Sequence, residues 1–470
     1  MTTSLSHSSD TFLADTLLPL AEFAQRRANF VAKMPKASLA FFAAAEEVTR
    51  SNDTEFPFCQ DKNFYYLTGF NEPNAFLLLR KSSTGKIKSC LVCWQKDPLM
   101  EVWHGRRIGP DSAKIVYGFD QAYPLSELDQ AVAELMNNTE QLWSCRDQAP
   151  RLDKKISQWL ATSDRLQRQG VVSPKIRFDC NAVLDELRVI KSDAELAIMR
   201  QVNMISGAAH QRAMLKAKQG LYEYQLEAEI LHAFADKGAR YPAYGTIVAS
   251  GDNANILHYT ANNCRLSSGE LILIDAGGEL AGYAADITRT FPVNGQFSAE
   301  QKSLYLLVLD AQQQAIEAIK PKQTLAALNE LVCNVLTSGL LELGILTGDL
   351  AQLNHDKACK KYFIHGLGHW LGLDVHDVGD YQVKDKRQTR DFQPGMVMTI
   401  EPGIYIPLDD LTVEQKWRGI GIRIEDNIAV TDTGHENLTI NAPKSVEDIE
   451  ALMQQKMITT AQPEVTTDEA

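Results

Sequence analysis

Three histidines lie close together in the segment of residues 365–377, which reads His-Gly-Leu-Gly-His-Trp-Leu-Gly-Leu-Asp-Val-His-Asp. They are His365, His369 and His376, from a total of ten histidines in the chain. One isolated histidine is usually an ordinary packed residue, whereas three in one glycine-rich stretch indicate a common site. His365 and His369 are spaced to share a helix face, yet each glycine between them would cost about 1 kcal/mol in a helix interior. We therefore expect an irregular segment whose backbone lies tightly against another part of the molecule.

Two acidic residues stand at the ends of apolar runs. The run Leu271–Ile274 leads into Asp275, which is followed by an alanine and two glycines. The run Met396–Ile400 leads into Glu401, which is followed by a proline and a glycine. A buried strand that ends in a carboxylate and glycines places that carboxylate where the backbone and a ligand can come close.

Two further acidic residues lie in segments that alternate like strands. Asp286 begins Asp-Ile-Thr-Arg-Thr-Phe eleven residues after Asp275, a spacing that fits a hairpin with one aspartate in each arm. Gly421–Asp426 also alternates, so Arg423 and Glu425 would share one strand face and line a polar site. A single acid at a strand end is usually a turn former or a helix cap. Four of them in one part of the chain are better explained by a common site.

Four carboxylates with one imidazole predict a metal site. Their four negative charges would be balanced by two divalent cations, without which mutual repulsion would raise several of the carboxyl pKa values. Ligation dominated by oxygen favours a hard ion such as Mn²⁺ over the sulfur-rich surroundings of structural zinc. Two ions about 3.5 to 4 Å apart can share one hydroxide and stabilise a tetrahedral intermediate. Hydrolysis is therefore the predicted chemistry.

The elements that would position these residues divide the chain into two domains, as its length of 470 residues also suggests. Residues 1–187 alternate short apolar runs with amphipathic segments, which predicts a small α/β domain. Ser192 and Glu195 form a capping box that begins a long helix, and a similar start at Ser298 hints at two related halves within residues 188–456. Residues 457–470 are polar, and we expect them to form a disordered tail.

Composition excludes several classes of function. A net charge of -13 argues against a nucleic-acid-binding surface, so a small molecule or a peptide is the expected partner. No apolar run reaches the roughly 18 residues of a membrane-spanning helix. The chain has no Lys or Arg before Arg26, which disfavours secretory and mitochondrial signals. The eight scattered cysteines suit reduced thiols, and the lone Cys90-x-x-Cys93 pair suits ordinary packing, so we expect a cytoplasmic protein.

At these residues the chain resembles the aminopeptidase P group of the pita-bread metallopeptidases. The family's five metal ligands are matched in order by Asp275, Asp286, His369, Glu401 and Glu425. The resemblance extends upstream through residues 50–55, 66–73 and 102–107, and so covers nearly the whole chain. It implies an α/β (α+β) protein in which a small N-terminal α/β domain is followed by a C-terminal pita-bread (creatinase/aminopeptidase-like) catalytic domain.

The resemblance also implies roles for individual residues. Asp286 and Glu425 would bridge two divalent ions, Asp275 would complete one, and His369 with Glu401 the other. Glu401 would also handle protons for the bridging hydroxide. His258, His365 and His376 match positions around the scissile bond, and Tyr244 and Arg423 match further site positions. Asp53 matches a position near the free amine of the substrate, and Trp103 matches a position in the N-terminal domain. In tetrameric relatives the residue matching Trp103 can reach a neighbouring subunit's site, and simple packing at a domain edge is the alternative for this residue. The resemblance implies a homo-oligomer, a dimer or a tetramer.

The implied activity is release of the N-terminal residue from peptides with proline in second position, by attack of a metal-bridging hydroxide. Proline explains why a dedicated enzyme is needed, because its amide has no N–H and its ring blocks sites built for ordinary peptides. Prolidase, which cleaves Xaa-Pro dipeptides, shares the metal ligands and is the nearest alternative. A binding module without catalysis is a third possibility, but such proteins are expected to lose metal ligands and this chain retains all five.

Overall fold

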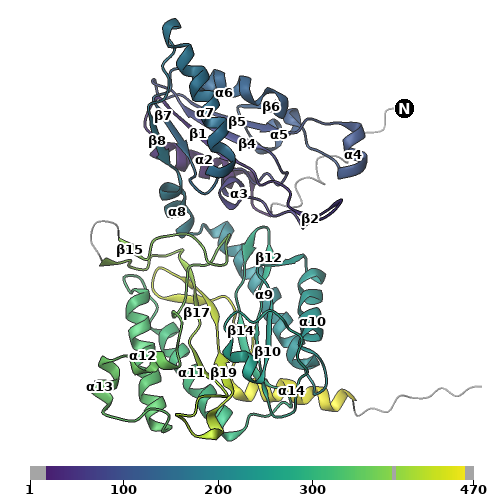
Figure 1. Ribbon diagram of the computed structural model, residues 1–470, viewed down its shortest axis with the longest axis vertical. Helices are drawn as coiled ribbons and strands as arrows, with labels where there is room; N and C mark the ends of the chain where they lie inside the picture. Colours follow the sequence, from purple (N-terminus) through teal and green to yellow (C-terminus); the bar gives the residue numbers. More distant parts are fainter. Residues whose placement is uncertain (1–16, 384–387, 461–470) are drawn as a thin grey trace, which may run out of the picture. The chain divides into compact units, whose positions relative to one another are not determined.

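The computed structural model describes residues 17–383 and 388–460. It separates into two compact units, which divide between Leu187 and Arg188 (Figure 1). The first unit is built on a six-stranded sheet in the order β6-β5-β4-β1-β7-β8. Its strands are β1 (Ser38–Ala43), β4 (Phe76–Lys81), β5 (Ile87–Cys93), β6 (Gln121–Pro124), β7 (Gln141–Ser144) and β8 (Ile176–Asp179). β1 pairs antiparallel with β4 and parallel with β7, so the sheet is mixed.

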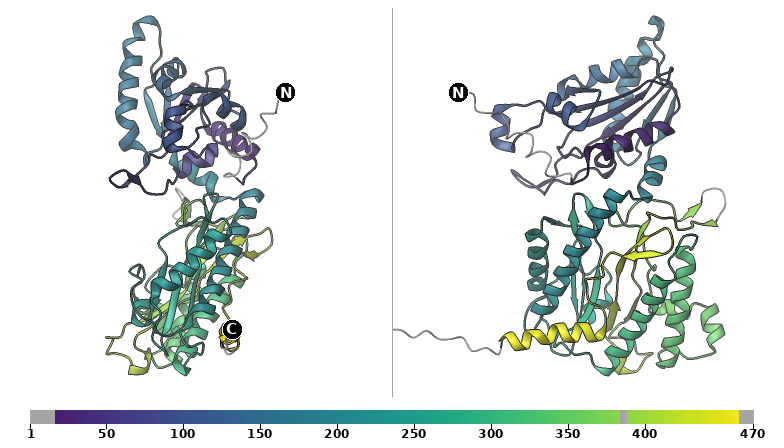
Figure 2. Two further views of the ribbon diagram at one scale, coloured as in Figure 1. Left: turned by 90° about the vertical axis from the view of Figure 1, so that its right-hand side faces the viewer. Right: turned by 180° about the vertical axis from the view of Figure 1, so that it is seen from behind.

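Helices cover both faces of this sheet (Figure 2). The helices of this part of the chain are α2 (Leu20–Lys33), α3 (Lys62–Thr68), α4 (Pro98–His104), α5 (Pro110–Tyr117), α6 (Leu128–Met136), α7 (Ala149–Arg165) and α8 (Asn181–Val189). On one face Phe41 stacks on Trp159 of α7, with ring centroids 5.3 Å apart. On the other face Phe42 contacts Phe30 of α2 edge to face. Alternate residues of β1 therefore contribute to two apolar layers, and the expected small α/β domain is confirmed.

The second unit places helices around several short antiparallel sheets. Its helices are α9 (Asp193–Lys216), α10 (Glu223–Asp236), α11 (Ala299–Glu317), α12 (Leu325–Glu342), α13 (Leu350–His355) and α14 (Val446–Thr460). The sheets that carry the acidic residues are β10 (Ile247–Ser250), β11 (Leu271–Asp275) and β14 (Thr288–Pro292); β17 (Val397–Ile400), β20 (Asp426–Val430) and β21 (His435–Asn437); and β18 (Gly403–Ile406) with β19 (Ile420–Arg423).

Shorter elements complete both units. The remaining strands are β2 (Thr49–Ser51), β3 (Thr54–Glu55), β9 (Tyr241–Pro242), β12 (Gly278–Leu280), β13 (Tyr283–Ala284), β15 (Gln382–Val383) and β16 (Gln388–Thr389). The 3₁₀ turns are η1 (Leu125–Glu127), η2 (Gln167–Gln169), η3 (Gly251–Asn255), η4 (Ala358–Lys361) and η5 (Gln415–Trp417).

The two helix starts expected from capping boxes are confirmed. At α9 the Ser192 hydroxyl accepts from the Glu195 N–H at 3.3 Å, and the Glu195 carboxylate accepts from the Ser192 N–H at 2.9 Å. Ser298 and Gln301 make the equivalent pair of bonds at the start of α11. Each box satisfies two N–H groups that the first turn of a helix leaves without partners.

The predicted hairpin forms, with an insertion. β11 and β14 pair antiparallel, and Asp275 lies opposite Thr288. The chain between them is not a tight connection, because it also forms the short strands β12 and β13, which pair with each other. Asp286 therefore lies two residues before β14 rather than inside it.

The alternation over residues 421–426 predicts one strand, and this is wrong. The structure has two strands here, since β19 ends at Arg423 and pairs with β18, whereas β20 begins at Asp426 and pairs with β17. The break occurs at Glu425, whose N–H donates to the carbonyl of Thr288 at 3.1 Å and whose carbonyl accepts from Arg289 at 2.6 Å. These bonds to β14 replace the ladder that a continuous strand would need.

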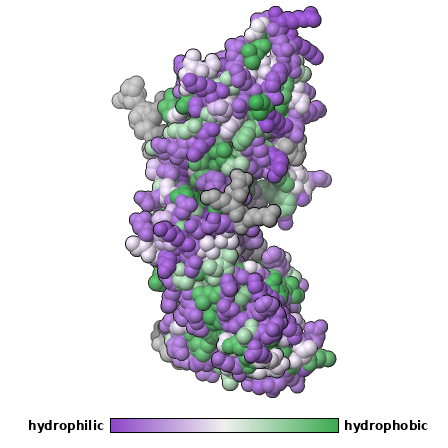
Figure 3. Space-filling model, turned by 90° about the vertical axis from the view of Figure 1, so that its left-hand side faces the viewer, coloured by the Kyte–Doolittle hydropathy of each residue, from purple (hydrophilic) through white to green (hydrophobic). Residues whose placement is uncertain are grey.

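Three other expectations concern the surface, the thiols and the tail. Within the described residues no helix combines the length and the apolar composition needed to cross a membrane, and hydrophilic side chains dominate the face shown in Figure 3. All eight cysteines are free thiols, and Cys90 and Cys93 are buried as ordinary packing residues. Helix α14 includes residues 457–460 of the predicted disordered tail, and residues 461–470 lie outside the described part of the chain.

Candidate metal centre and active site

A cavity of about 230 Å³ in the second unit collects most of the predicted site residues. Its lining comprises Leu257, His258, Asp275, Asp286, His365, Gly366, Gly368, His369, His376, Glu401, Arg423 and Glu425. Nine of these residues are ones that the sequence predicts to form one site. The structure therefore brings together residues that are up to 167 positions apart in the chain.

The acidic residues reach this cavity from the ends of buried strands. Asp275 ends β11 and Glu401 follows β17, as the apolar runs predict. Asp286 precedes β14, and Glu425 lies in the break between β19 and β20. The side chains of Asp286 and Glu425 are almost fully buried, with 5% and 1% of each residue exposed.

The histidine segment is irregular and lies against β17, as expected. His369 donates its N–H to the hydroxyl of Thr399 at 3.0 Å, and the N–H of Thr399 donates to the carbonyl of His369 at 2.9 Å. A Cβ on Gly368 would lie 1.9 Å from the carbonyl oxygen of Thr399, so only glycine fits there. At Gly366, by contrast, no described atom lies within 4 Å of such a Cβ. The close backbone approach therefore depends on Gly368.

Three of the predicted ligands form a compact donor set. One donor atom each from Asp286, His369 and Glu425 all lie within 4.8 Å of one another. Nε2 of His369 is 3.4 Å from Oδ2 of Asp286 and 3.6 Å from Oε1 of Glu401. Oε1 of Glu425 is buried and has no hydrogen-bond partner among the described residues. A buried carboxylate oxygen without a donor requires an explanation, and a bound cation would provide it.

The electrostatics of the cavity also fit a cation. Burial, followed by the charges of Asp286 and Glu401, raises the pKa of Glu425 well above its ordinary value. Burial together with Asp275 likewise raises the pKa of Asp286. Burial lowers the pKa of His369, but the hydrogen bond and the charge of Asp286 outweigh it and raise that pKa to about 9. Excess negative charge at buried oxygen donors with one imidazole suits a hard divalent ion.

Asp275 lies outside the donor set of Asp286, His369 and Glu425, and it bonds to Tyr244 and Arg423 instead. The hydroxyl of Tyr244 lies 2.5 Å from Oδ1 of Asp275 and 2.6 Å from Oδ1 of Asp286. Arg423 donates from Nη2 to Oδ2 of Asp275 at 2.7 Å. Tyr244 thus links the two aspartates, and Arg423 is the cation that lies beside them.

A chain of hydrogen bonds fixes the proton of His365. Arg423 can only donate, so Nη1 donates to the hydroxyl of Tyr405 at 3.0 Å, and that hydroxyl donates to Nε2 of His365 at 2.7 Å. Nδ1 then carries the proton and donates to the carbonyl of Gly366 at 2.7 Å. Burial, followed by Arg423, lowers the pKa of His365 to about 4, so the ring is neutral. Nδ1 is also 3.9 Å from Oε2 of Glu401.

The other two histidines also lie at the cavity. The ring centroid of His376 is 4.1 Å from that of His369, and His258 lines the wall. Burial, followed by the charges of His369 and His258, lowers the pKa of His376. A neutral imidazole at His376 can exchange hydrogen bonds with a bound peptide.

Two predicted residues belong to the first unit. Asp53 lies in the turn between β2 and β3 with a φ of 58°. Trp103 lies on α4 and is 76% exposed.

Sequence reasoning missed Tyr405 and Thr288. Tyr405 joins Arg423 to His365, and the hydroxyl of Thr288 contacts Glu425 at 2.7 Å. The alternation of Ile404, Tyr405 and Ile406 contains a signal for the first, because it places the tyrosine on the strand face opposite two isoleucines.

Comparison with known proteins gives a consistent result. Residues 197–432 match the model of metallopeptidase family M24, and residues 23–143 match that of the aminopeptidase P N-terminal domain. The chain is 44% identical to the Xaa-Pro aminopeptidase of Escherichia coli over 92% of this chain and 97% of that protein. The structure of E. coli aminopeptidase P with the inhibitor Pro-Leu superposes with a TM-score of 0.90 at 44% identity, covering 94% and 99% of the two chains. A Zn-substituted form in complex with product gives a TM-score of 0.91 at the same identity over 93% and 99%. These likenesses confirm the predicted fold class.

Proposed function

Because the chain belongs to metallopeptidase family M24, we propose that it is a metal-dependent aminopeptidase that hydrolyses the first peptide bond of peptides with proline in second position. The observation that carries this proposal is the cluster of Asp286, His369 and Glu425, with its buried and unpartnered carboxylate oxygen. The relatives named Xaa-Pro aminopeptidase support the choice of substrate.

The proposed cofactor is a pair of divalent cations, with Mn²⁺ as the expected ion. Asp286 and Glu425 would hold both ions, Asp275 one of them, and His369 with Glu401 the other. Bound there, the ions would supply a hydroxide at neutral pH and offset the negative charge that develops on the peptide carbonyl. The oxygen-rich donor set supports a hard ion, and the Zn-substituted relative supports a site that accepts a divalent metal.

The chain's own residues would move the protons and stabilise the developing charge. Glu401, at the cavity wall beside His365, would accept the proton of the attacking water and return it to the leaving nitrogen. His258 and His376 would donate hydrogen bonds to the peptide around the scissile bond. His365, whose two ring nitrogens already bond Tyr405 and Gly366, would shape the pocket there. Arg423, oriented by Tyr405 and Asp275, would contribute fixed positive charge.

Substrate positioning is proposed for three further residues. Tyr244, whose hydroxyl lies between two of the carboxylates, would help to place the substrate at the ions. Asp53 would bind the free amine, and Trp103 would contribute apolar contact. Support for the last two comes from the sequence match of the N-terminal domain.

The test is hydrolysis of Arg-Pro-Pro by protein stripped with EDTA, with and without added Mn²⁺, followed as release of free arginine. We expect no release from stripped protein and restored release with Mn²⁺. Cleavage of the dipeptide Arg-Pro alone would support a prolidase instead. Failure to cleave either peptide, with the protein folded and loaded, would leave a binding module as the better description.

We further propose a cytoplasmic homo-oligomer. The free thiols of all eight cysteines suit a reducing compartment. Helix α4 exposes Leu99, Val102 and Trp103 by 70%, 79% and 76%, an apolar surface that association would cover. Sedimentation of the wild-type protein and of Trp103→Ala measures the oligomeric state of each. A wild-type protein that sediments as a monomer would contradict the proposed assembly.

A further inference from the structure

The residue two positions after Glu425 holds the main chain of Asp286. Asn427 is fully buried, and its side-chain amide contacts both polar groups of the Asp286 backbone. The N–H of Asp286 donates to Oδ1 of Asn427 at 2.9 Å, and Nδ2 of Asn427 donates to the carbonyl oxygen of Asp286. Because one amide satisfies both groups, Asp286 cannot shift without leaving two buried polar groups unpaired.

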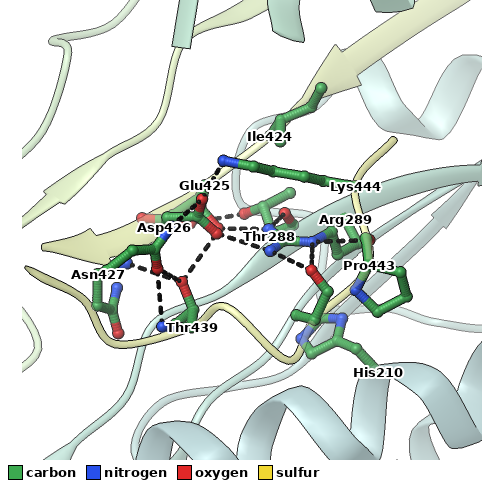
Figure 4. Close-up of polar contacts among 12 residues, drawn as sticks. His210, Thr288, Arg289, Ile424, Glu425, Asp426, Asn427, Thr439, Pro443 and Lys444 are labelled. Atoms are coloured by element: carbon green, nitrogen blue, oxygen red, sulfur yellow. Dashed lines mark hydrogen bonds and ion pairs between the residues drawn. The ribbon is translucent and has the colours of Figure 1, made fainter. Parts of the chain in front are cut away.

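The residue directly after Glu425 belongs to a buried ion network (Figure 4). Arg289 is fully buried and donates from Nη1 to the carbonyl of Glu425 at 2.6 Å and from Nη2 to Oδ1 of Asp426 at 2.6 Å. The Asp426 carboxylate is satisfied by further donors, which are Lys444, Asn437 and Thr439. A buried polar network whose members are fully hydrogen-bonded is rigid, and here it fixes the main chain of Glu425.

A hydroxyl fixes the carboxylate of Glu425 itself. Thr288 donates to Oε2 of Glu425 at 2.7 Å and accepts from Nε of Arg423 at 3.0 Å. Since the guanidinium can only donate, the hydroxyl proton of Thr288 must point at Glu425. Oε1 of Glu425 is left without a donor among the described residues, and Glu425 lines the cavity.

We infer that Thr288, Arg289, Asp426 and Asn427 form a ligand clamp that positions Asp286 and Glu425 and thereby sets the affinity of the site for divalent metal. None of the four is among the described residues that line the cavity, so the clamp acts through the two carboxylates. This inference rests on the proposed function, in which Asp286 and Glu425 are the residues shared by both ions. Carboxylates that repel each other must be held in place before cations bind, and partners behind a ligand typically change metal affinity 10- to 100-fold.

The experiment titrates MnCl₂ into full-length, metal-stripped protein by isothermal calorimetry. We expect Asn427→Ala to bind Mn²⁺ roughly 10 to 100 times more weakly than the wild type. Thr288→Val, which removes only the hydroxyl, should weaken binding in the same direction. Thr288→Ser, which keeps the hydroxyl, should restore the wild-type affinity.

A matched control comes from the first unit. Gln148 is buried and makes the same double contact, since its Oε1 accepts from the N–H of Ala43 at 2.9 Å and its Nε2 donates to the carbonyl of Ala43 at 3.2 Å. Gln148→Ala should therefore lose a comparable clamp and leave the affinity for Mn²⁺ unchanged.

The outcomes separate the two proposals. A wild-type protein that binds no Mn²⁺ contradicts the proposed function. A wild-type protein that binds Mn²⁺, with Asn427→Ala and Thr288→Val binding equally well, overturns the clamp and leaves the proposed function standing. If Asn427→Ala does not fold, the comparison of Thr288→Val with Thr288→Ser decides the question.

Discussion

Removing the carboxylate of Asp377 should destabilise the second unit more than the loss of a surface ion pair would. Asp377 accepts from Arg188 at 2.6 Å and from Lys191 at 2.9 Å, and all three side chains are buried. In Asp377→Asn, Arg188 keeps its contact with Asp374 at 2.7 Å, whereas Lys191 loses its charged partner. Breaking a buried pair costs about 3–5 kcal/mol, and because one cation remains paired we expect the lower end, about 3 kcal/mol.

The assay is thermal unfolding of full-length, metal-stripped protein at pH 7. With about 2–4 °C per kcal/mol for a unit of this size, the midpoint should fall by roughly 6–12 °C. The control is Glu436→Gln, which breaks the exposed pair between Glu436 and Arg200 and should cost less than about 1 kcal/mol. If Asp377→Asn lowers the unfolding free energy no more than this control does, the conclusion that the variant leaves the buried charge of Lys191 unpaired is wrong.

The pH dependence gives a second check on the same residue. Burial raises the pKa of Asp377, but Lys191 and Arg188 outweigh it and hold that pKa below its ordinary value. A depressed carboxyl pKa stabilises the folded state above the unfolded pKa of about 3.9, and this stability is lost as the pH falls through the folded pKa. The difference in unfolding free energy between the wild type and Asp377→Asn should therefore be constant above about pH 5 and become smaller at lower pH.

Three further changes test the active site. Gly368→Ala would place a Cβ 1.9 Å from the carbonyl oxygen of Thr399. It should lower the unfolding midpoint, at a cost of about 1–3 kcal/mol. The control is Gly366→Ala, which has open space at its Cβ and should unfold at the wild-type temperature. Glu401→Ala should abolish release of arginine from Arg-Pro-Pro while circular dichroism stays unchanged, and a fully active variant would refute its role. Tyr405→Phe removes the hydroxyl between two cavity side chains and should lower kcat/KM for the same peptide by roughly 5- to 150-fold, since unpaired buried partners cost about 1–3 kcal/mol.

Local patterns account for what the sequence predicts correctly. An apolar run that stops at Asp275 or Glu401 is visible within ten residues, and so is a capping box at Ser192. The structure confirms these because strand ends and helix starts depend mainly on nearby residues. The assignment of individual ligands needed the resemblance to a family, because spacing alone does not show which strand ends meet.

Distant partners account for what the sequence does not predict. Arg289 would share a strand face with the apolar Ile287 and Phe291, and a buried arginine is rare unless it is paired. Its partner Asp426 lies 137 residues away, beyond any local pattern. The break at Glu425 is unpredictable for the same reason, because the bonds that interrupt the strand come from β14, which is equally distant in the sequence.

The ion network behind Glu425 has a consequence for how cofactor loading and folding are related. Arg289 and Lys444 neutralise Asp426 with charges that the polypeptide itself supplies. Small metal-dependent domains fold only when the ion arrives, because no site exists in the unfolded chain and metal binding supplies the free energy of folding. Here the scaffold is complete beforehand, so chelation should leave a folded apoprotein that can exchange one divalent ion for another without passing through an unfolded chain.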